Sequence, residues 1–276
     1  MLMTMIFVAL LATAAVLVGA GFLHLLPRLG KIGRACGGAF CRAPALDLAV
    51  TYFLIVPPVC AVIFAGWPGL LGSVVGQIIG LQIWVFLHEF ANRSARRGPR
   101  IVKTLNRIVG RWRNHLALWV TAIVVPIFWV IRVAQIFIYP ALSWLVALPR
   151  YRHAEWVNVS RQKFDGLIGH DLIWCLYCDW MTGVWSLGSE MLRNVESFWC
   201  PIRFYDDKKC ENCRIDFPDV AGTPGAPGWV PADSTMAEVS ELLEQQYAPK
   251  GDNGWFGHPA RLTVNGEPIS TDSPKK

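Results

Sequence analysis

Two Cys-x-x-Cys pairs carry the most specific chemistry in this sequence. The first pair, Cys175 and Cys178, lies in "WCLYCDW", and the second, Cys210 and Cys213, lies in "KKCENCR". A Cys-x-x-Cys turn offers two thiolates to one zinc ion, and structural zinc takes four ligands in a tetrahedron. The two pairs therefore form a candidate zinc site. Substitute ligands for this site are Cys200 and His170.

Other interpretations of the thiols stay open. The gap between the pairs is 31 residues, whereas zinc ribbons of this type usually have about 15–20. The first pair also lies in an apolar, helix-like run instead of a turn. An accessible, activated pair would favour thiol–disulfide exchange. Otherwise the first pair consists of buried helix cysteines and the second pair binds nothing.

Signatures of common enzyme classes are missing. "HEF" begins at His88, but Asn92 stands where a zinc-protease helix needs its second histidine. The phosphate-binding loop, the nucleophile elbow and the dinucleotide-binding glycine pattern are also absent from the sequence. We therefore assign no catalytic residue. We favour a non-enzymatic protein, with a thiol–disulfide oxidoreductase as the one enzyme class still open.

The composition divides the chain into a membrane part and an aqueous part. Hydrophobic residues make up 53% of the chain, and the mean hydropathy is +0.36. Residues 1–149 carry thirteen Lys/Arg and two acids, whereas residues 150–276 carry thirteen Lys/Arg and eighteen acids. Basic residues that flank apolar segments are typical of bilayer proteins. The excess of positive charge therefore does not indicate nucleic acid, and we expect no nucleic-acid partner.

We expect residues 1–149 to be a transmembrane region. The predicted spans lie at about 2–26, 46–67 and 69–90. The first span has no charge and is followed by basic residues, so we expect a signal-anchor with the N-terminus outside. The second and third spans are separated by little more than "WPG", which predicts a helical hairpin. The glycines of the third span, spaced by four, favour close approach of another helix; they are Gly72, Gly76 and Gly80.

The segment 92–113 is the most basic stretch of the chain, with no acid. The positive-inside rule places it in the cytoplasm together with residues 28–42. Residues 101–113 either lie on the membrane as an amphipathic helix near anionic lipid or form a solvated loop. The candidate membrane-surface residues are Arg93, Arg96, Arg97, Arg100, Lys103, Arg107, Arg111 and Arg113.

The apolar segment 116–149 is ambiguous, because it is long for one span and short for two. Arg132 stands at its centre, and we expect Pro126 and Pro140 to break it. If it crosses once, the rest of the chain lies outside; if it re-enters, the rest stays inside. Basic residues at both ends favour re-entrant or interfacial helices and a cytoplasmic C-terminal domain.

The aqueous half contains a helical segment and a small α+β part. Residues 150–199 are rich in Cys and Trp, and the apolar spacing from 165 onwards predicts one or two helices. "PIRFYDDKKCENCRIDFPD" predicts a β-hairpin, and "ARLTVNGEPIS" predicts a strand and turn. Between them, "DSTMAEVSELLEQQY" predicts an amphipathic helix capped by Asp233 or Ser234.

This order of hairpin, helix and strand, over about residues 200–271, resembles the ubiquitin-like (β-grasp) superfamily. The segment "IRFYDD…CRIDFP" matches its hairpin, the helix matches its Thr-x-x-x-Val-x-x-x-Leu pattern, and "RLTVNGEPI" matches its Arg-Leu-x-x-x-Gly segment. The resemblance implies a β-grasp fold over residues 200–276 and a protein-docking surface. The chain lacks a C-terminal Gly-Gly, so the resemblance does not imply conjugation to other proteins.

We therefore expect an α-helical integral membrane region of three or four hydrophobic segments, followed by a small α+β domain that is β-grasp-like at its C-terminal end. The expected function is that of an accessory, assembly or scaffold protein that presents a cytoplasmic docking domain, with zinc as a candidate structural cofactor. The alternative is a membrane thiol–disulfide oxidoreductase. The expected partners are the lipid bilayer, at the inner or plasma membrane, and a protein.

Overall fold

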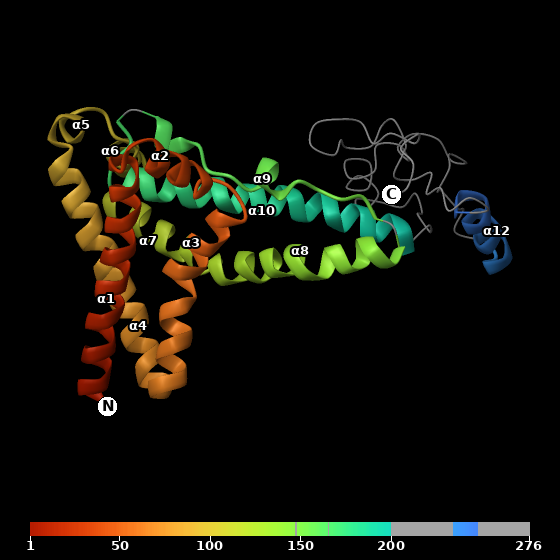
Figure 1. The fold of residues 1–276 in the computed structure, drawn as a ribbon, viewed down its shortest axis with the longest axis horizontal. Helices are drawn as coiled ribbons and strands as arrows, with labels where there is room; N and C mark the ends of the chain where they lie inside the picture. The colour runs from red at the N-terminus through yellow and green to blue at the C-terminus, as the bar shows by residue number, and fades with distance from the viewer. Residues whose placement is uncertain (147, 165, 200–233, 248–276) are drawn as a thin grey trace. The chain divides into compact units, whose positions relative to one another are not determined.

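The computed structural model describes residues 1–146, 148–164, 166–199 and 234–247, almost all of them helical (Figure 1). The chain forms two compact units. The first unit comprises Met1–Val130 and His153–Val184, and the second comprises Ile131–Arg152 and Trp185–Lys276. Two helices, α8 (Val125–Val146) and α10 (His170–Trp199), belong partly to each unit.

The other elements are short, except for α1 and α4. In chain order, those of the first unit are α1 (Leu2–Leu25), η1 (Leu26–Arg28), α2 (Gly30–Ala39), α3 (Ala45–Leu54), α4 (Val56–Ala91), α5 (Arg93–Arg97), α6 (Ile101–Val109), α7 (Arg111–Ala122), α9 (His153–Trp156) and η2 (Arg161–Lys163). Helix α12 (Met236–Tyr247) belongs to the second unit.

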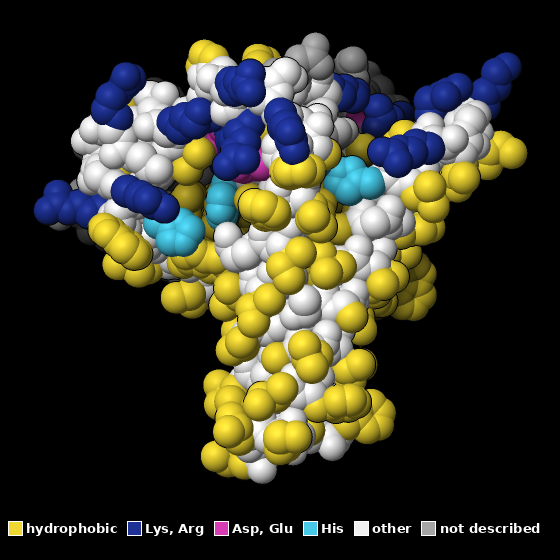
Figure 2. All heavy atoms as spheres, turned by 90° about the vertical axis from the view of Figure 1, so that its left-hand side faces the viewer, with side chains coloured by type: hydrophobic (Ala, Val, Ile, Leu, Met, Phe, Trp, Pro, Cys, Tyr) yellow, Lys and Arg dark blue, Asp and Glu magenta, His cyan; other side chains and the backbone are white. Residues whose placement is uncertain are grey.

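Three helical stretches are long and apolar enough to cross a membrane, as the composition of the first half predicts. They are Leu2–Arg28, Ala45–Ala91 and Arg111–Val146. Figure 2 shows hydrophobic side chains over the lower part of the first unit and Lys and Arg side chains gathered above them. This division matches a hydrocarbon core below a headgroup region.

The second apolar stretch folds back on itself. Gly66 has φ 58° and ψ −148°, a conformation that glycine adopts without a Cβ clash, and Pro68 follows it. The chain before and after this turn runs in opposite directions (Figure 1). The predicted hairpin is therefore present, and its two arms lie within α3 and α4.

A side-chain contact between the two arms satisfies the backbone at a proline pair. Pro57 and Pro58 have no N–H groups, so the carbonyls of Phe53 and Leu54 lose their helical donors. Gln77, on the opposite arm, donates from Nε2 to the Phe53 carbonyl at 2.7 Å. Its distance to the Leu54 carbonyl is 3.5 Å. In an apolar environment a neighbouring helix has to supply such donors, because water is absent.

The glycine pattern of α4 brings α1 into backbone contact. A Cβ atom at Gly72 would lie 2.5 Å from the Met5 carbonyl oxygen, and one at Gly76 would overlap the Ala9 carbonyl oxygen. Thr13 Oγ1 donates to the Gly76 carbonyl at 3.0 Å. The predicted close approach of another helix is therefore confirmed, and that helix is α1.

The ambiguous segment forms two helices, α7 and α8. They are separated at Ile123 and Val124, just before Pro126, so the chain breaks near the first of the two predicted positions. Pro140 lies inside α8, and the helix continues past it. Prolines of this kind are tolerated in apolar helices when neighbours satisfy the backbone.

The aqueous helices differ in detail from the predictions. The segment from 165 onwards contains one helix of 30 residues, α10, and the predicted amphipathic helix is α12. Its cap is Thr235 instead of Asp233 or Ser234. The Thr235 N–H donates to Glu238 Oε2 at 2.6 Å, and the Glu238 N–H donates to Thr235 Oγ1 at 3.4 Å. This reciprocal pair is a capping box, which needs Thr and Glu three residues apart. The predicted β-hairpin and final strand lie outside the described residues.

Candidate functional site

A short backbone pairing joins two distant parts of the first unit. The Val159 N–H donates to the Cys41 carbonyl at 2.8 Å, and the Ala43 N–H donates to the Val157 carbonyl at 3.0 Å. The two segments run antiparallel, and Val157 is fully buried. The chain that precedes α3 therefore lies directly beside the chain that follows α9.

A buried ion-pair cluster formed by Glu89, Arg100 and Asp171, the Arg100 cluster, lies in the same unit. Arg100 Nε donates to Asp171 Oδ2 at 2.6 Å, and Arg100 Nη2 donates to Glu89 Oε1 at 2.9 Å. Nη2 also donates to the Ile168 carbonyl at 3.0 Å. The cluster joins the end of α4, the start of α6 and the start of α10.

Burial strengthens the pairing in this cluster. The exposed fraction is 2% for the Arg100 side chain and 4% for that of Asp171. Burial alone would lower the pKa of Arg100, but hydrogen bonds to Asp171 and Glu89 outweigh it and hold that pKa above its usual value. Asp171 Oδ1 also accepts the Val102 N–H at 2.9 Å. It thereby satisfies one of the open donors at the N-terminus of α6 and places negative charge there.

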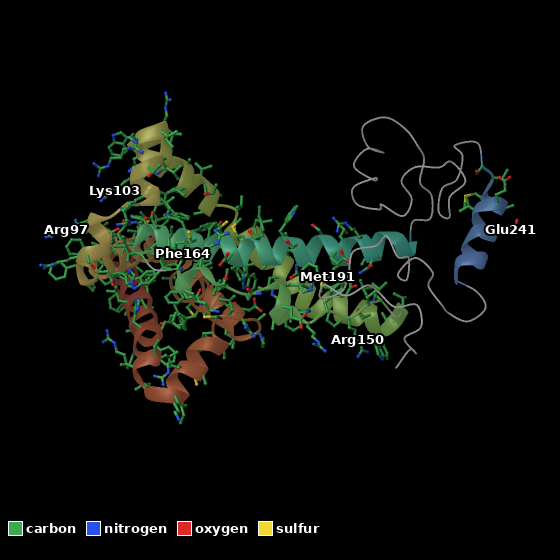
Figure 3. All side chains as sticks on the ribbon, turned by 90° about the horizontal axis from the view of Figure 1, so that it is seen from above. Arg97, Lys103, Arg150, Phe164, Met191 and Glu241 are labelled. Carbon is green, nitrogen blue, oxygen red and sulfur yellow. The ribbon has the colours of Figure 1, made fainter. Side chains whose placement is uncertain are left out.

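Arg100 therefore differs from the other predicted membrane-surface residues. The sequence pattern groups it with seven basic neighbours, but its side chain faces the protein interior. The other seven are exposed: Arg93, Arg96, Arg97, Lys103, Arg107, Arg111 and Arg113. Arg93 lies 4.0 Å over the ring of Phe90, and Lys103 Nζ donates to the Arg96 carbonyl at 2.8 Å. Figure 3 shows Arg97 and Lys103 at the edge of the first unit.

Four histidines from four helices lie around the Arg100 cluster. The rings of His24 and His88 stack with centroids 5.2 Å apart, and those of His115 and His170 meet edge to face at 5.9 Å. The Gly169 N–H donates to His88 Nδ1 at 3.1 Å, which links the two pairs. Figure 2 shows histidine side chains at the border between the hydrophobic and basic regions.

Indole groups hold two of these imidazoles in place. Trp84 Nε1 donates to His24 Nε2 at 2.9 Å, and Trp119 Nε1 donates to His115 Nε2 at 3.1 Å. Each hydrogen bond restricts the rotation of the imidazole ring that accepts it. Among the described residues, no group of three or more His, Cys, Asp or Glu side chains has an arrangement that suits a metal ion.

The first Cys-x-x-Cys pair lies on α10. Cys175 is half-buried, Cys178 is exposed, and neither is in a disulfide. Beside the pair, Arg161 Nε lies 2.6 Å from Asp179 Oδ1. Burial is the largest single influence and opposes the charged form of Arg161, but Asp179 and the two cysteines together outweigh it and raise the pKa of Arg161.

The other predicted zinc ligands are not brought together with this pair by any described contact. Cys200, Cys210 and Cys213 lie outside the described residues. His170 is on α10 but pairs with His115. Burial and the nearby His115 lower the pKa of His170, and Glu89 and Asp171 only partly offset this. The zinc site therefore stays a prediction.

The second unit contains a buried polar cluster that the sequence interpretation did not identify. Asn194 is fully buried, and its Nδ2 donates to the hydroxyls of Tyr139, at 3.2 Å, and Tyr151. The Tyr151 hydroxyl donates to Glu190 Oε1 at 3.3 Å. Burial raises the pKa of Tyr151, so this hydroxyl keeps its proton and stays a donor. A sequence signal for part of this cluster is the four-residue spacing of Glu190 and Asn194, which places both on one face of α10.

Arg132, at the centre of the ambiguous segment, is also buried. Its exposed fraction is 2%, and its Nη1 donates to Gln135 Oε1 at 2.9 Å. Charged groups inside apolar segments are costly and usually face other protein groups. The interior position of Arg132 follows that rule.

Comparisons with protein-family models, with curated proteins and with solved structures found no match for this chain.

Proposed function

We propose that this chain is an integral membrane accessory, assembly or scaffold protein that presents residues 200–276 to a protein partner in the cytoplasm. The N-terminus then lies outside the inner or plasma membrane. The observation that carries the proposal is the backbone pairing of residues 41–43 with residues 157–159. It supports a common side of the membrane for the loop before α3 and the chain after α8.

The number of membrane crossings between the paired residues 41–43 and 157–159 bears on the topology of the chain. The hairpin at Gly66 returns the chain to the side from which it entered. The pairing of Val157 with Ala43 then supports a segment from Arg111 to Val146 that begins and ends on one side. The positive-inside rule favours the cytoplasm as that side, because residues 92–113 carry eight basic residues and no acid. This supports re-entrant or interfacial helices at 116–149.

The Arg100 cluster supports the scaffold part of the proposal. It fixes the start of α10 to the ends of the helices around it through charge-assisted hydrogen bonds, which are the strongest kind. The Trp180 indole adds a contact to Asp47 Oδ1 at 3.4 Å. Helix α10 leads directly into residues 200–276, so whatever those residues bind is held at the membrane.

Photo-crosslinking in intact membranes tests the docking role. We compare the full chain with a chain that ends after Trp199, and with the Cys175→Ser/Cys178→Ser variant. The truncated chain should insert normally but lose its crosslinks to other proteins, whereas the double serine variant should keep them. Unchanged crosslinks in the truncated chain would refute docking through residues 200–276.

Metal analysis tests the zinc part separately. Purified full chain should contain zinc in stoichiometric amount, and chelation should release it together with newly reactive thiols. The Cys210→Ser/Cys213→Ser variant should contain no zinc, whereas Cys36→Ser should keep it. If the purified wild-type protein contains no metal, the zinc proposal is refuted and the docking proposal is unaffected.

The second candidate function is thiol–disulfide exchange, favoured by the free and at least partly exposed thiols of Cys175 and Cys178 on one helix. Two thiols at i and i+3 of a helix lie on one face. In this role they would reduce a partner disulfide, giving up two electrons and two protons and forming a Cys175–Cys178 disulfide. Alkylation after mild oxidation should then show the loss of two reactive thiols, and the loss should be absent in Cys175→Ser. If both thiols alkylate fully under these conditions, this function is excluded.

A further inference from the structure

Helix α6 has an apolar face that the described part of the chain leaves uncovered. Ile101, Leu105 and Ile108 follow one another by four and three residues, which places them on one side of the helix. Val109 adjoins them, and their exposed fractions range from 38% to 69%. A helix of a water-soluble protein normally buries such a face.

The opposite side of the same helix is basic. Lys103 and Arg107 are spaced by four residues and are both exposed. Arg111 and Arg113 follow across Gly110, and no acidic residue occurs between Arg93 and Arg113. An apolar face below a basic face is the pattern of a helix that lies in a membrane interface.

The chain places α6 at membrane level. It begins ten residues after Ala91, where one candidate span ends, and it ends two residues before Arg111, where another begins. Its N-terminus is held by Asp171 through the Val102 N–H, and Asn114 Nδ2 donates to Asn106 Oδ1 at 2.9 Å to hold it against α7. Residues 101–109 therefore form a helix that is attached to α10 and α7 by hydrogen bonds.

We propose that α6 inserts its apolar face into the cytoplasmic leaflet and binds anionic phospholipid headgroups through Lys103, Arg107, Arg111 and Arg113. Lipid is the occupant that the surface favours, because continuous basic charge complements an anionic headgroup layer and acyl chains cover the apolar side. Long basic side chains reach the headgroups while their stems lie over apolar surface. This inference does not depend on docking or zinc binding.

Hydrogen–deuterium exchange of the full chain in nanodiscs tests the site. Discs of phosphatidylcholine are compared with discs containing about one third phosphatidylglycerol, and we expect the amides of α6 to exchange about tenfold more slowly in the anionic discs. Added salt should weaken this protection by screening. Equal exchange in the two kinds of disc would overturn the proposal.

Matched variants separate lipid binding from misfolding and from net charge. Lys103→Glu/Arg107→Glu should abolish the extra protection of α6 while leaving exchange in α1 unchanged. The control Arg34→Glu reverses another exposed basic residue, in α2, and should leave α6 protected in anionic discs. Ile108→Asn should reduce the protection in both kinds of disc. If instead polyglutamate protects α6 in phosphatidylcholine discs and phosphatidylglycerol does not, the partner is an acidic protein and the lipid site is refuted.

Discussion

At the scale of single residues, Arg100 shows how burial changes the role of a charge. Seven neighbouring basic side chains face outward, and their loss should matter little for folding. Arg100 instead holds two carboxylates inside the protein. Removing it leaves the buried Asp171 charge without compensation, which is far more costly than the loss of an exposed ion pair.

We therefore predict that Arg100→Ala lowers the free energy of unfolding by about 3–5 kcal/mol. Arg100→Lys should have a free energy of unfolding between those of the wild type and Arg100→Ala. Lysine keeps the charge but cannot donate to both carboxylates from a planar fork. Arg97→Ala, at an exposed neighbour, should change it by less than about 0.5 kcal/mol. Denaturant titration in detergent micelles measures all three. Equal losses for Arg97→Ala and Arg100→Ala would contradict the cluster.

His170 gives the first unit a pH dependence. Its pKa in the folded protein is below 6.5, because burial and the neighbouring His115 and Arg100 disfavour the charged form, with Glu89 and Asp171 opposing them. Since the unfolded chain then binds the proton more readily, the contribution of His170 is complete above pH 6.5 and is lost as pH falls through the lower, folded pKa.

The unfolding midpoint should accordingly fall on acidification from about pH 7 to pH 5, as protons bind preferentially to the unfolded state. The His170→Gln variant should flatten this decline, and His153→Gln serves as a control outside the histidine group. Midpoints measured by scanning fluorimetry at several pH values test the effect. An equally steep decline in His170→Gln would show that other groups cause it.

Residue-level predictions from sequence had clear limits. The basic character of 92–113 was evident, but nothing in it distinguished Arg100 from Arg97, because the partner Asp171 lies 71 residues further along the chain. The spacing of the two Cys-x-x-Cys pairs is evident in the sequence, but the ion pair of Arg161 with Asp179 beside the first pair is not, because it joins residues 18 positions apart.

At the scale of elements, α1 and α4 show how two helices pack where the hydrophobic effect does not favour their association. Lipid chains are as apolar as leucine, so helices associate in a bilayer through close contact and hydrogen bonds. The row of glycines in α4 and the Thr13–Gly76 hydrogen bond supply both.

Gly76→Ala should therefore destabilise the protein by about 1–3 kcal/mol, the usual cost of forcing an extra carbon into a packed contact. Gly21→Ala is the matched control, because Gly21 lies in α1 with nothing within 4 Å of its added Cβ. That change should be neutral or slightly stabilising, as alanine favours helix. Unfolding by SDS titration compares them, and equal effects would show that α1 and α4 do not pack through this row.

The elements of the membrane half could be predicted well from sequence, because lipid allows few alternatives to helices. The length of the uncharged segments predicts the spans, and the short Trp-Pro-Gly separation between two of them predicts the hairpin. The bond from Gln77 to Phe53 could not be foreseen, since it depends on which residues face each other across the turn. The cap of α12 was misassigned because Asp233, Ser234 and Thr235 are all good caps, and Glu238 selects the one three residues before it.

At the scale of the whole molecule, the proposed topology predicts a cytoplasmic C-terminus. Green fluorescent protein fused after Lys276 should be fluorescent in cells, whereas alkaline phosphatase at the same position should be inactive, because each reporter folds on one side only. The same reporters fused before Met1 should give the opposite result if the N-terminus lies outside. Active phosphatase after Lys276 would mean that α7 and α8 cross the membrane once.

The boundary near residue 149 is predicted from hydrophobicity and charge, which separate residues suited to lipid from residues suited to water. The two compact units follow packing instead, and each contains chain from both sides of that boundary. Hydropathy cannot report such pairing, because the contacts of Ala43 with Val157 and of Arg100 with Asp171 join residues far apart in sequence.

The fold-back at Gly66 has a consequence for biogenesis. Because only a few residues join the two arms, we expect the arms to enter the bilayer together as a pair. The turn carries no charge, so moving it across the bilayer requires little free energy. An aspartate or lysine placed at Trp67 would therefore hinder delivery of the nascent chain into the membrane, even though the mature helices could accommodate it at the far interface.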